Sequence, residues 1–200
     1  MSEAHKIFGY GSLVNQKTIP NEHVKRSKRA KLLGYTRDWC CPVYVSGVRF
    51  LALGVHRAES NADIIEGLLI ETDDNGLNYL EEREVGYARQ AACSFDEYQN
   101  KEACTTYCLP RSQEGYIALS YLCTVVDGFR QISGERGVQR FLETTRFRER
   151  RILHDLRAPR YRRIPNSAFR EERVIRRYLD NNTDSVYVYE VEMSDEWCIT

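Results

Sequence analysis

Phe8-Gly9-Tyr10-Gly11-Ser12-Leu13 is the most informative segment of this chain, because it ends a short apolar strand and opens a glycine-containing loop. Gly9 and Gly11 permit a positive φ and let backbone N–H groups approach a ligand closely, and Ser12 adds a hydroxyl. The segment lacks the third glycine of a dinucleotide fingerprint, and no Gly-Lys-Ser/Thr follows it. It therefore indicates a backbone cradle for a small ligand, and neither a nicotinamide cofactor nor a nucleoside triphosphate.

Length and composition predict one compact domain over residues 1–200. The 200 residues have ordinary hydrophobic content and no Gly/Ser/Pro-rich linker, so the chain is long enough to bury a sizeable core. The first residues contain no apolar run of signal-peptide length, and no stretch approaches the roughly 20 apolar residues needed to span a bilayer. We therefore expect a cytoplasmic protein with no membrane partner.

The seven cysteines are odd in number and scattered, which favours reduced core thiols over a disulfide framework. Cys104-x-x-x-Cys108 has no second cysteine pair and no nearby histidine, so we expect no metal site. The seven are Cys40, Cys41, Cys93, Cys104, Cys108, Cys123 and Cys198.

The first half of the chain is rich in predicted strands, and one short helix is predicted over 77–83. Gly67 interrupts one of these strands, which indicates a bulge or a close backbone approach rather than a flat strand. A hairpin is expected between the last two strands. The predicted strands cover 6–8, 31–35, 49–56, 64–70, 90–98 and 103–109.

After Pro110 the apolar residues change to helical spacing, which predicts two amphipathic helices. Ile117, Tyr121, Val125 and Phe129 are spaced by four in the first. Segment 156–166 contains two prolines and should be irregular, 168–179 should be helical, and 185–192 should form a terminal strand. We expect an arginine-rich helical C-terminal region at about 135–182.

The zero net charge hides a segregation of charge. Residues 146–177 carry twelve arginines and four acids, so this window is +8 and the remainder is −8. Such a surface is suited to nucleic acid, to an acidic partner, or to an acidic face of its own domain or of a second subunit in a homodimer. Aromatic residues do not regularly interleave the arginines, which favours a solvated or self-paired surface over nucleic-acid binding.

One carboxylate lies where the helix over 77–83 should turn its apolar face inward. At about 100° per residue, Glu84 falls within about 10° of the mean direction of Leu77 and Leu80 if the helix continues that far. Burial there would raise the carboxyl pKa toward the range where proton transfer at neutral pH is efficient. The alternative is an ion pair of Glu84 with Arg83 or Arg89 that performs no chemistry. The glycine cradle favours the catalytic interpretation.

Three motifs in this order resemble the γ-glutamylcyclotransferase family: the Tyr-Gly-Ser loop at 8–13, Glu66-Gly67 within a strand, and 80–89, where Glu84 is followed by Tyr87. Ser120-Tyr121-Leu122 resembles the Ser-Tyr helix start of the family, and 153–165 resembles the C-terminal part of bacterial relatives. The resemblance spans residue 6 to about 129. Within this family the resemblance implies a relationship to the ChaC-type branch. The glutathione-specific members of that branch have a longer, Gly-Gly-containing spacer between Glu and Tyr, where this chain has only Val85 and Gly86.

The resemblance implies an α+β fold, a small mixed β-barrel flanked by helices, with no metal or organic cofactor. It implies that Glu84 is the acid/base of an intramolecular reaction in which the α-amine of a γ-glutamyl substrate attacks its own γ-carbonyl. The products would be 5-oxoproline and an amine or amino acid. Tyr87 and Tyr121 would also bind substrate, although the spacing of Tyr121 is equally typical of core and Tyr87 could simply begin the next strand. The cradle residues implied to hold the γ-glutamyl group are Tyr10, Gly11, Ser12 and Leu13.

Two other functions are alternatives: a related γ-glutamyl acyltransferase, and a non-catalytic binding or regulatory protein whose arginine-rich surface engages an acidic partner. The Glu84 carboxylate and the glycine cradle argue against the second, and a steep salt dependence of polyanion binding would argue for it. For the arginine-rich region itself, three roles are open. It closes the pocket, forms a subunit contact, or contributes arginines that select an anionic leaving group.

Overall fold

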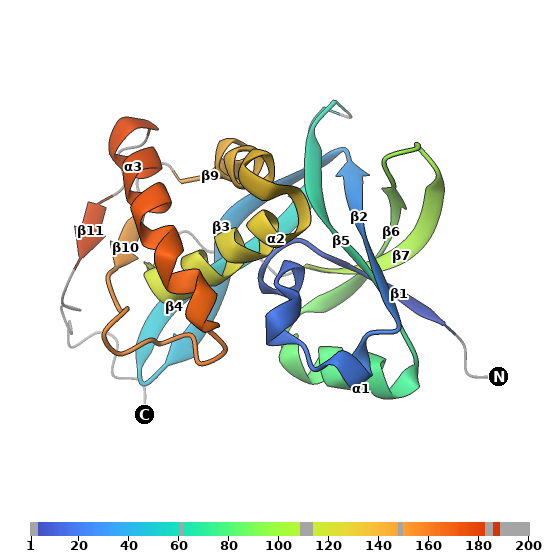
Figure 1. The fold of residues 1–200 in the computed structure, drawn as a ribbon, viewed down its shortest axis with the longest axis horizontal. Helices are drawn as coiled ribbons and strands as arrows, with labels where there is room; N and C mark the ends of the chain where they lie inside the picture. The colour runs from blue at the N-terminus through green and yellow to red at the C-terminus, as the bar shows by residue number, and fades with distance from the viewer. Residues whose placement is uncertain (1–3, 61, 109–113, 148–149, 183–185, 189–200) are drawn as a thin grey trace.

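The computed structural model describes residues 4–60, 62–108, 114–147, 150–182 and 186–188. Two sheets organise these residues: a closed five-stranded barrel in the order β1-β5-β2-β6-β7, and a second sheet in the order β11-β10-β8-β4-β3-β9. Figure 1 shows the barrel next to the N-terminus and the second sheet beside α3, with α2 passing between them. The predicted α+β class, a small barrel flanked by helices, is confirmed.

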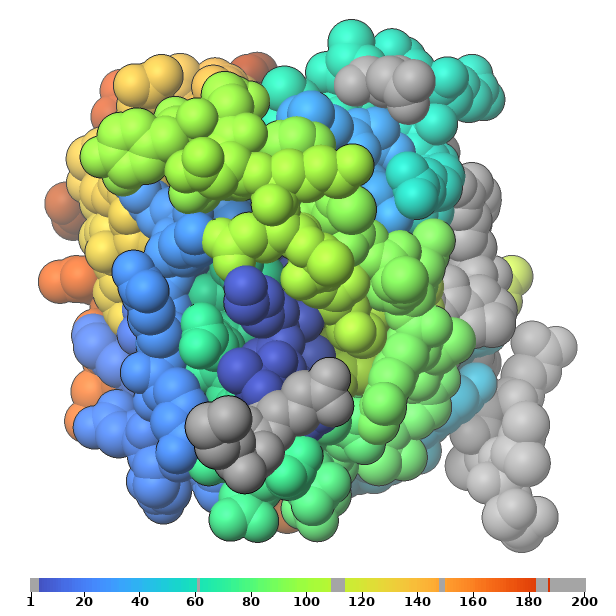
Figure 2. Space-filling view, turned by 90° about the vertical axis from the view of Figure 1, so that its right-hand side faces the viewer, coloured from blue at the N-terminus to red at the C-terminus, as the bar shows by residue number. Residues whose placement is uncertain are grey.

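The barrel closes because its first strand pairs on both sides. β1 (His5–Gly9) is antiparallel to β5 (Ile64–Thr72) and parallel to β7 (Lys101–Cys108), and β2 (Arg26–Leu33) and β6 (Ala88–Phe95) complete the ring. Figure 2 looks onto the barrel and shows the start of β1 (dark blue) surrounded by β2 (blue) and the β6–β7 hairpin (yellow-green). The predicted hairpin between the last two barrel strands is confirmed.

Gly67 shows why one barrel position requires glycine. A Cβ atom at Gly67 would lie 2.3 Å from the carbonyl oxygen of Gly9 and 2.6 Å from the ring of Phe8. The β2–β5 register runs through Gly67 without a shift. The predicted close backbone approach is therefore confirmed, and the alternative of a bulge is wrong.

The second sheet is built on a long hairpin, β3 (Tyr35–Val45) and β4 (Val48–Arg57). Its two-residue turn has positive φ at Ser46 and Gly47, the geometry that joins twisted antiparallel strands. Strand β3 was not predicted beyond Tyr35, because a buried Arg37 and a register shift at Cys40 break the alternation of apolar residues. The shorter strands are β8 (Tyr116–Ala118), β9 (Thr145–Arg146), β10 (Arg151–Leu153) and β11 (Val186–Val188).

Three α-helices accompany the sheets: α1 (Asp74–Arg83), α2 (Leu119–Glu143) and α3 (Glu172–Asn182). Gly134 has φ 59° and divides α2 into two helical pieces, which agrees with the two predicted helices. Ile117 was expected in the first of them and instead lies in β8. Short 3-10 turns cover Ser12–Val14 (η1), Gln16–Thr18 (η2), Asn21–His23 (η3) and Asn166–Glu171 (η4). Among the described helices, none has both the length and the apolar composition needed to cross a bilayer.

The predictions for the cysteines and for the terminal strand include residues outside the described part of the chain. Cys40, Cys41, Cys104 and Cys123 are buried free thiols, Cys108 is half-buried and Cys93 is exposed, so the core-thiol interpretation is wrong for Cys93. Cys198 lies outside the described residues, and so does Leu109, the last residue of the strand predicted over 103–109. Of the predicted terminal strand at 185–192, the described part is β11. The described residues contain no group of three or more side chains able to hold a metal ion.

Candidate active site

A pocket of about 540 Å³ lies where the two sheets meet the starts of η1 and α2, a volume typical of small-molecule sites. Its lining includes all seven residues that the sequence singled out, so three segments far apart along the chain are brought together at one cavity. They are Tyr10, Gly11, Ser12, Leu13, Glu84, Tyr87 and Tyr121. Their chemical roles stay predictions.

The cradle loop follows β1 directly and folds back as a tight 3-10 turn. The N–H of Val14 donates to the carbonyl of Gly11 at 3.0 Å, and a Cβ atom at Gly9 would meet the Cβ of Leu13 at 2.7 Å. Among the described residues, no hydrogen bond uses the N–H of Gly11 or of Ser12. The loop thus offers backbone donors beside the pocket, and only glycine at position 9 lets it fold this tightly.

The Tyr10 side chain serves the wall of the pocket rather than its chemistry. Its hydroxyl donates to the carbonyl oxygen of Tyr107 at 2.6 Å, and burial raises its pKa well above the usual value. The hydroxyl therefore stays neutral and is already engaged. What Tyr10 offers to a ligand is its backbone position in the loop.

Arg37 is a buried residue behind the cradle that sequence reasoning missed. Its guanidinium donates to the carbonyl of Tyr10 at 2.9 Å and to the carbonyl of Glu66 at 3.2 Å. Burial lowers its pKa to about 9, so it remains charged at neutral pH. Further donors reach Thr145 and Thr144, and the group lies over the rings of Phe129 and Phe141. The strand that carries Arg37 was not predicted, so no sequence signal pointed to it.

Glu84 is the C-cap of α1, one residue beyond the last helical turn, and its half-buried carboxylate lines the pocket. Burial raises its pKa to about 7, and the positive charges of Arg83 and Arg163 oppose this shift. A carboxyl group with a pKa near neutrality can both accept and return a proton at physiological pH. The helix ends one residue before Glu84, and the Glu84 side chain still lines the pocket.

The alternative interpretation of Glu84, a satisfied ion pair, does not describe this site. Arg83 donates instead to the carbonyl oxygen of Thr18 at 2.7 Å and to its hydroxyl at 3.2 Å, and Arg89 pairs with Glu81. Within the described part of the chain, the Glu84 carboxylate forms no ion pair. Its charge is therefore available to a ligand.

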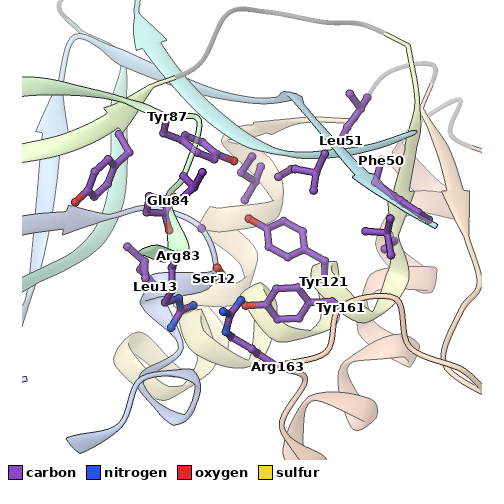
Figure 3. Close-up of a pocket in the computed structure, with 18 of the residues that line it drawn as sticks. Ser12, Leu13, Phe50, Leu51, Arg83, Glu84, Tyr87, Tyr121, Tyr161 and Arg163 are labelled. Carbon is purple, nitrogen blue, oxygen red and sulfur yellow. The ribbon is translucent and has the colours of Figure 1, made fainter. Parts of the chain in front are cut away.

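Two tyrosines share the space around Glu84. Figure 3 shows Tyr87, Glu84 and Tyr121 around the same part of the pocket. Burial raises the pKa of both tyrosines, so each hydroxyl is neutral at physiological pH and can donate a hydrogen bond. Tyr121 also packs edge-on against Trp39, with ring centroids 6.0 Å apart. The core and pocket interpretations of Tyr121 are therefore compatible.

The arginine-rich region reaches the pocket, as two of the three roles considered for it require. Residues 160–163 line it, and buried Asp155 holds this segment to the start of α2. The Asp155 carboxylate accepts from the Ser120 hydroxyl at 2.6 Å and from the N–H of Arg160 at 2.7 Å. The N–H of Tyr161 donates to the Ser120 hydroxyl at 3.1 Å. The backbone of 160–161 is thus fixed beside the site.

The opposite wall comes from the β3–β4 hairpin, which sequence reasoning had only half predicted. Phe50 and Leu51 of β4 line the pocket, together with Val43 and Tyr44 of β3. Figure 3 shows Phe50 and Leu51 on the side away from Glu84, with Tyr121 between. One side of the pocket is therefore apolar and the other is cationic.

Comparison with known proteins supports the fold. No protein-family model and no curated protein matches the chain. Solved structures do match: a γ-glutamyl cyclotransferase has a TM-score of 0.59 at 14% identity, over 70% of this chain and 86% of its own. An uncharacterized protein from Homo sapiens has a TM-score of 0.58 at 14% identity, over the same shares of each chain. A yeast γ-glutamyl cyclotransferase specific to glutathione has a TM-score of 0.52 at 10% identity, over 72% of this chain and 98% of its own.

At these identities the similarity establishes the architecture alone. The chain has the fold of γ-glutamyl cyclotransferase-like proteins, as the resemblance of its motifs implied. A relationship to the ChaC-type branch in particular stays a prediction.

Proposed function

We propose that this protein is a γ-glutamyl cyclotransferase that converts a γ-glutamyl amine or peptide into 5-oxoproline and the free amine. The observation that carries the proposal is Glu84, a carboxylate without an ion-pair partner among the described residues, placed at a small-molecule pocket beside the glycine loop. Its pKa, raised to about 7 by burial, suits a group that must take and then return one proton.

The reaction needs one bond to form and one to break. The α-amine of the substrate attacks its own γ-carbonyl carbon and forms the five-membered lactam, while the bond from that carbon to the departing nitrogen breaks. Glu84 accepts the proton that the attacking amine loses and delivers it to the departing nitrogen. The step is redox-neutral, and every proton stays between the substrate and Glu84.

The loop and the tyrosines supply the remaining parts. The N–H groups of Gly11 and Ser12 are suited to the substrate carboxylate or to the oxyanion that develops on the γ-carbonyl oxygen. The neutral hydroxyls of Tyr87 and Tyr121 are further donors. The apolar side of the pocket disfavours water, which would otherwise compete with the internal amine and give glutamate instead.

Mass-spectrometric detection of 5-oxoproline tests the proposal. The parent protein, Glu84→Gln and a matched control, Glu82→Gln on the exposed side of α1, are incubated with γ-glutamyl amino acids, γ-glutamyl amines and glutathione. We expect 5-oxoproline from the parent and from Glu82→Gln, and a loss of at least about 100-fold for Glu84→Gln. Transfer of the γ-glutamyl group to an added amine would favour an acyltransferase, and no product with any substrate would favour a binding protein.

A further inference from the structure

The pocket carries more positive charge than the γ-glutamyl group needs. Its charged lining residues are one carboxylate, Glu84, and four arginines, Arg83, Arg160, Arg162 and Arg163. A γ-glutamyl group brings a single carboxylate of its own. The excess positive charge must therefore be matched by solvent or by another part of the substrate.

Three of these arginines have no ion-pair partner within the described residues. Arg83 is committed to Thr18, as described above, whereas no salt bridge involves Arg160, Arg162 or Arg163. Elsewhere in the same region arginines are paired: Arg170 with Asp127 and Glu171, and Arg176 with Glu172. The expected solvated or self-paired surface is thus self-paired at these arginines, and solvated at the exposed Arg160, Arg162 and Arg163.

The backbone that carries these arginines is fixed. The N–H groups of residues 160 and 161 donate to Asp155 and Ser120, which are joined to each other by a buried hydrogen bond. The ring of Tyr161 packs edge-on against Tyr121, with centroids 5.1 Å apart. Figure 3 shows Tyr161 and Arg163 on the same side of the pocket as Arg83. Guanidinium groups on a fixed backbone are well suited to carboxylates, which they bind through two parallel hydrogen bonds.

Glu84 and the glycine loop occupy one end of the pocket, where the γ-glutamyl group reacts. We propose that Arg163, with Arg160 and Arg162, forms a leaving-group subsite that selects leaving amines carrying negative charge, and that prefers two charges to one. The inference rests on the proposed function, because it assigns the rest of the substrate to the rest of the same pocket. Phe50 and Leu51 line the same pocket and offer apolar surface to the carbon chain of a leaving group.

Three substrates of nearly one shape test this subsite. γ-Glutamyl-glutamate has a leaving group with two carboxylates, γ-glutamyl-glutamine has one, and γ-glutamyl-glutaminamide has none. For the parent we expect kcat/KM to rise by about 3- to 10-fold with each added charge, since exposed arginines are partly screened by solvent. For Arg163→Gln the three values should lie within about 2-fold of one another. The matched control is Arg173→Gln, an exposed arginine on α3 away from the pocket, which should retain the parent's ranking.

Two outcomes overturn the inference. One is a parent enzyme that treats the three substrates alike. The other is an Arg163→Gln variant that loses the same factor on all three, because that pattern places Arg163 on the carboxylate common to every γ-glutamyl group. Calorimetric binding of the same three compounds to Glu84→Gln separates this inference from the proposed function. The same ranking, abolished by Arg163→Gln in the double variant, supports the subsite even if no 5-oxoproline is formed, and equal or absent binding contradicts it.

Discussion

The guanidinium of Arg37 donates a 2.9 Å hydrogen bond to the carbonyl oxygen of Tyr10, from a side chain that is itself fully buried. The same group donates to the carbonyl of Glu66, so one cation joins the glycine loop to strand β5. Because a trans peptide is planar, fixing the Tyr10 carbonyl also turns the N–H of Gly11 to the opposite side. Arg37 thus sets the orientation of a cradle that it does not line.

Replacement of this cation should therefore cost stability as well as activity. Arg37→Met fills part of the space over the rings of Phe129 and Phe141 but leaves the carbonyls of Tyr10 and Glu66 without their donor. We expect the free energy of unfolding in urea to fall by about 2–5 kcal/mol. The same change at exposed Arg57, which lies over the ring of Tyr35, should cost below about 1 kcal/mol. Equal losses for the two variants would contradict the role of Arg37.

The raised pKa of Glu84 predicts how stability depends on pH. The folded protein retains the Glu84 proton up to about pH 7, whereas the unfolded chain releases it near the ordinary value of 4.5. Between these values the folded state binds more protons, so this residue makes the parent less stable as pH rises. Glu84→Gln should escape the loss and gain about 3 kcal/mol relative to the parent between pH 4 and pH 8. Chemical denaturation at both pH values measures this difference. For Glu82→Gln the difference in unfolding free energy from the parent should be the same at pH 4 and pH 8.

Activity should depend on pH through the same group. A base must be ionised, so kcat/KM should rise with pH through about 7. The positive charge of Arg163 holds the Glu84 pKa down, so Arg163→Gln should move this limb of the profile to higher pH. Arg173→Gln should leave it in place. An unchanged pH profile in Arg163→Gln would show that the side chains of Arg163 and Glu84 do not interact in solution.

Gly11 and Tyr121 should be energetically coupled. A Cβ atom at Gly11 would lie 2.9 Å from the hydroxyl oxygen of Tyr121, closer than such atoms normally approach. Gly11→Ala should therefore destabilise the protein, and the cost should be smaller in a Tyr121→Phe background where that oxygen is absent. A double-mutant cycle on unfolding free energy should give a coupling of about 0.5–3 kcal/mol. Additive effects would mean that the loop moves away from Tyr121 without cost.

Asp155 should control the subsite without touching substrate. One Asp155 oxygen accepts from the Ser120 hydroxyl and the N–H of Arg160, and the other accepts from the N–H of Ser120. In Asp155→Asn one of these oxygens becomes an NH₂ group, which accepts no hydrogen bond, so at least one donor loses its acceptor. We expect a loss of about 1–3 kcal/mol in stability. The discrimination between charged and neutral leaving groups should also weaken, because residues 160–163 are no longer held. Full discrimination in a destabilised variant would show that the segment is positioned by other contacts.

Local patterns predicted the cradle loop and the place of Glu84 on the apolar side of its helix. The spacing of two glycines and the angle between residues around a helix are both set by residues close together in the sequence. The fold class followed from motif order. Strand β3 was missed since Arg37 is a charged residue inside a buried strand, which alternation rules assign to the surface. Ile117 was assigned to a helix because its spacing continues into α2 across the end of β8. The place of residues 160 and 161 beside the pocket involves hydrogen bonds to Asp155 and Ser120, between residues distant in sequence, which no local pattern encodes.

The central claim is that the substrate's own amine, and not water, attacks the γ-carbonyl with Glu84 moving the proton. Turnover of a γ-glutamyl amino acid in ¹⁸O-enriched water, followed by mass spectrometry, tests it directly. We predict 5-oxoproline without the heavy isotope from the parent protein, and at least about 100-fold less of it from Glu84→Gln. Glutamate that carries ¹⁸O, or equal 5-oxoproline from both proteins, would contradict the account.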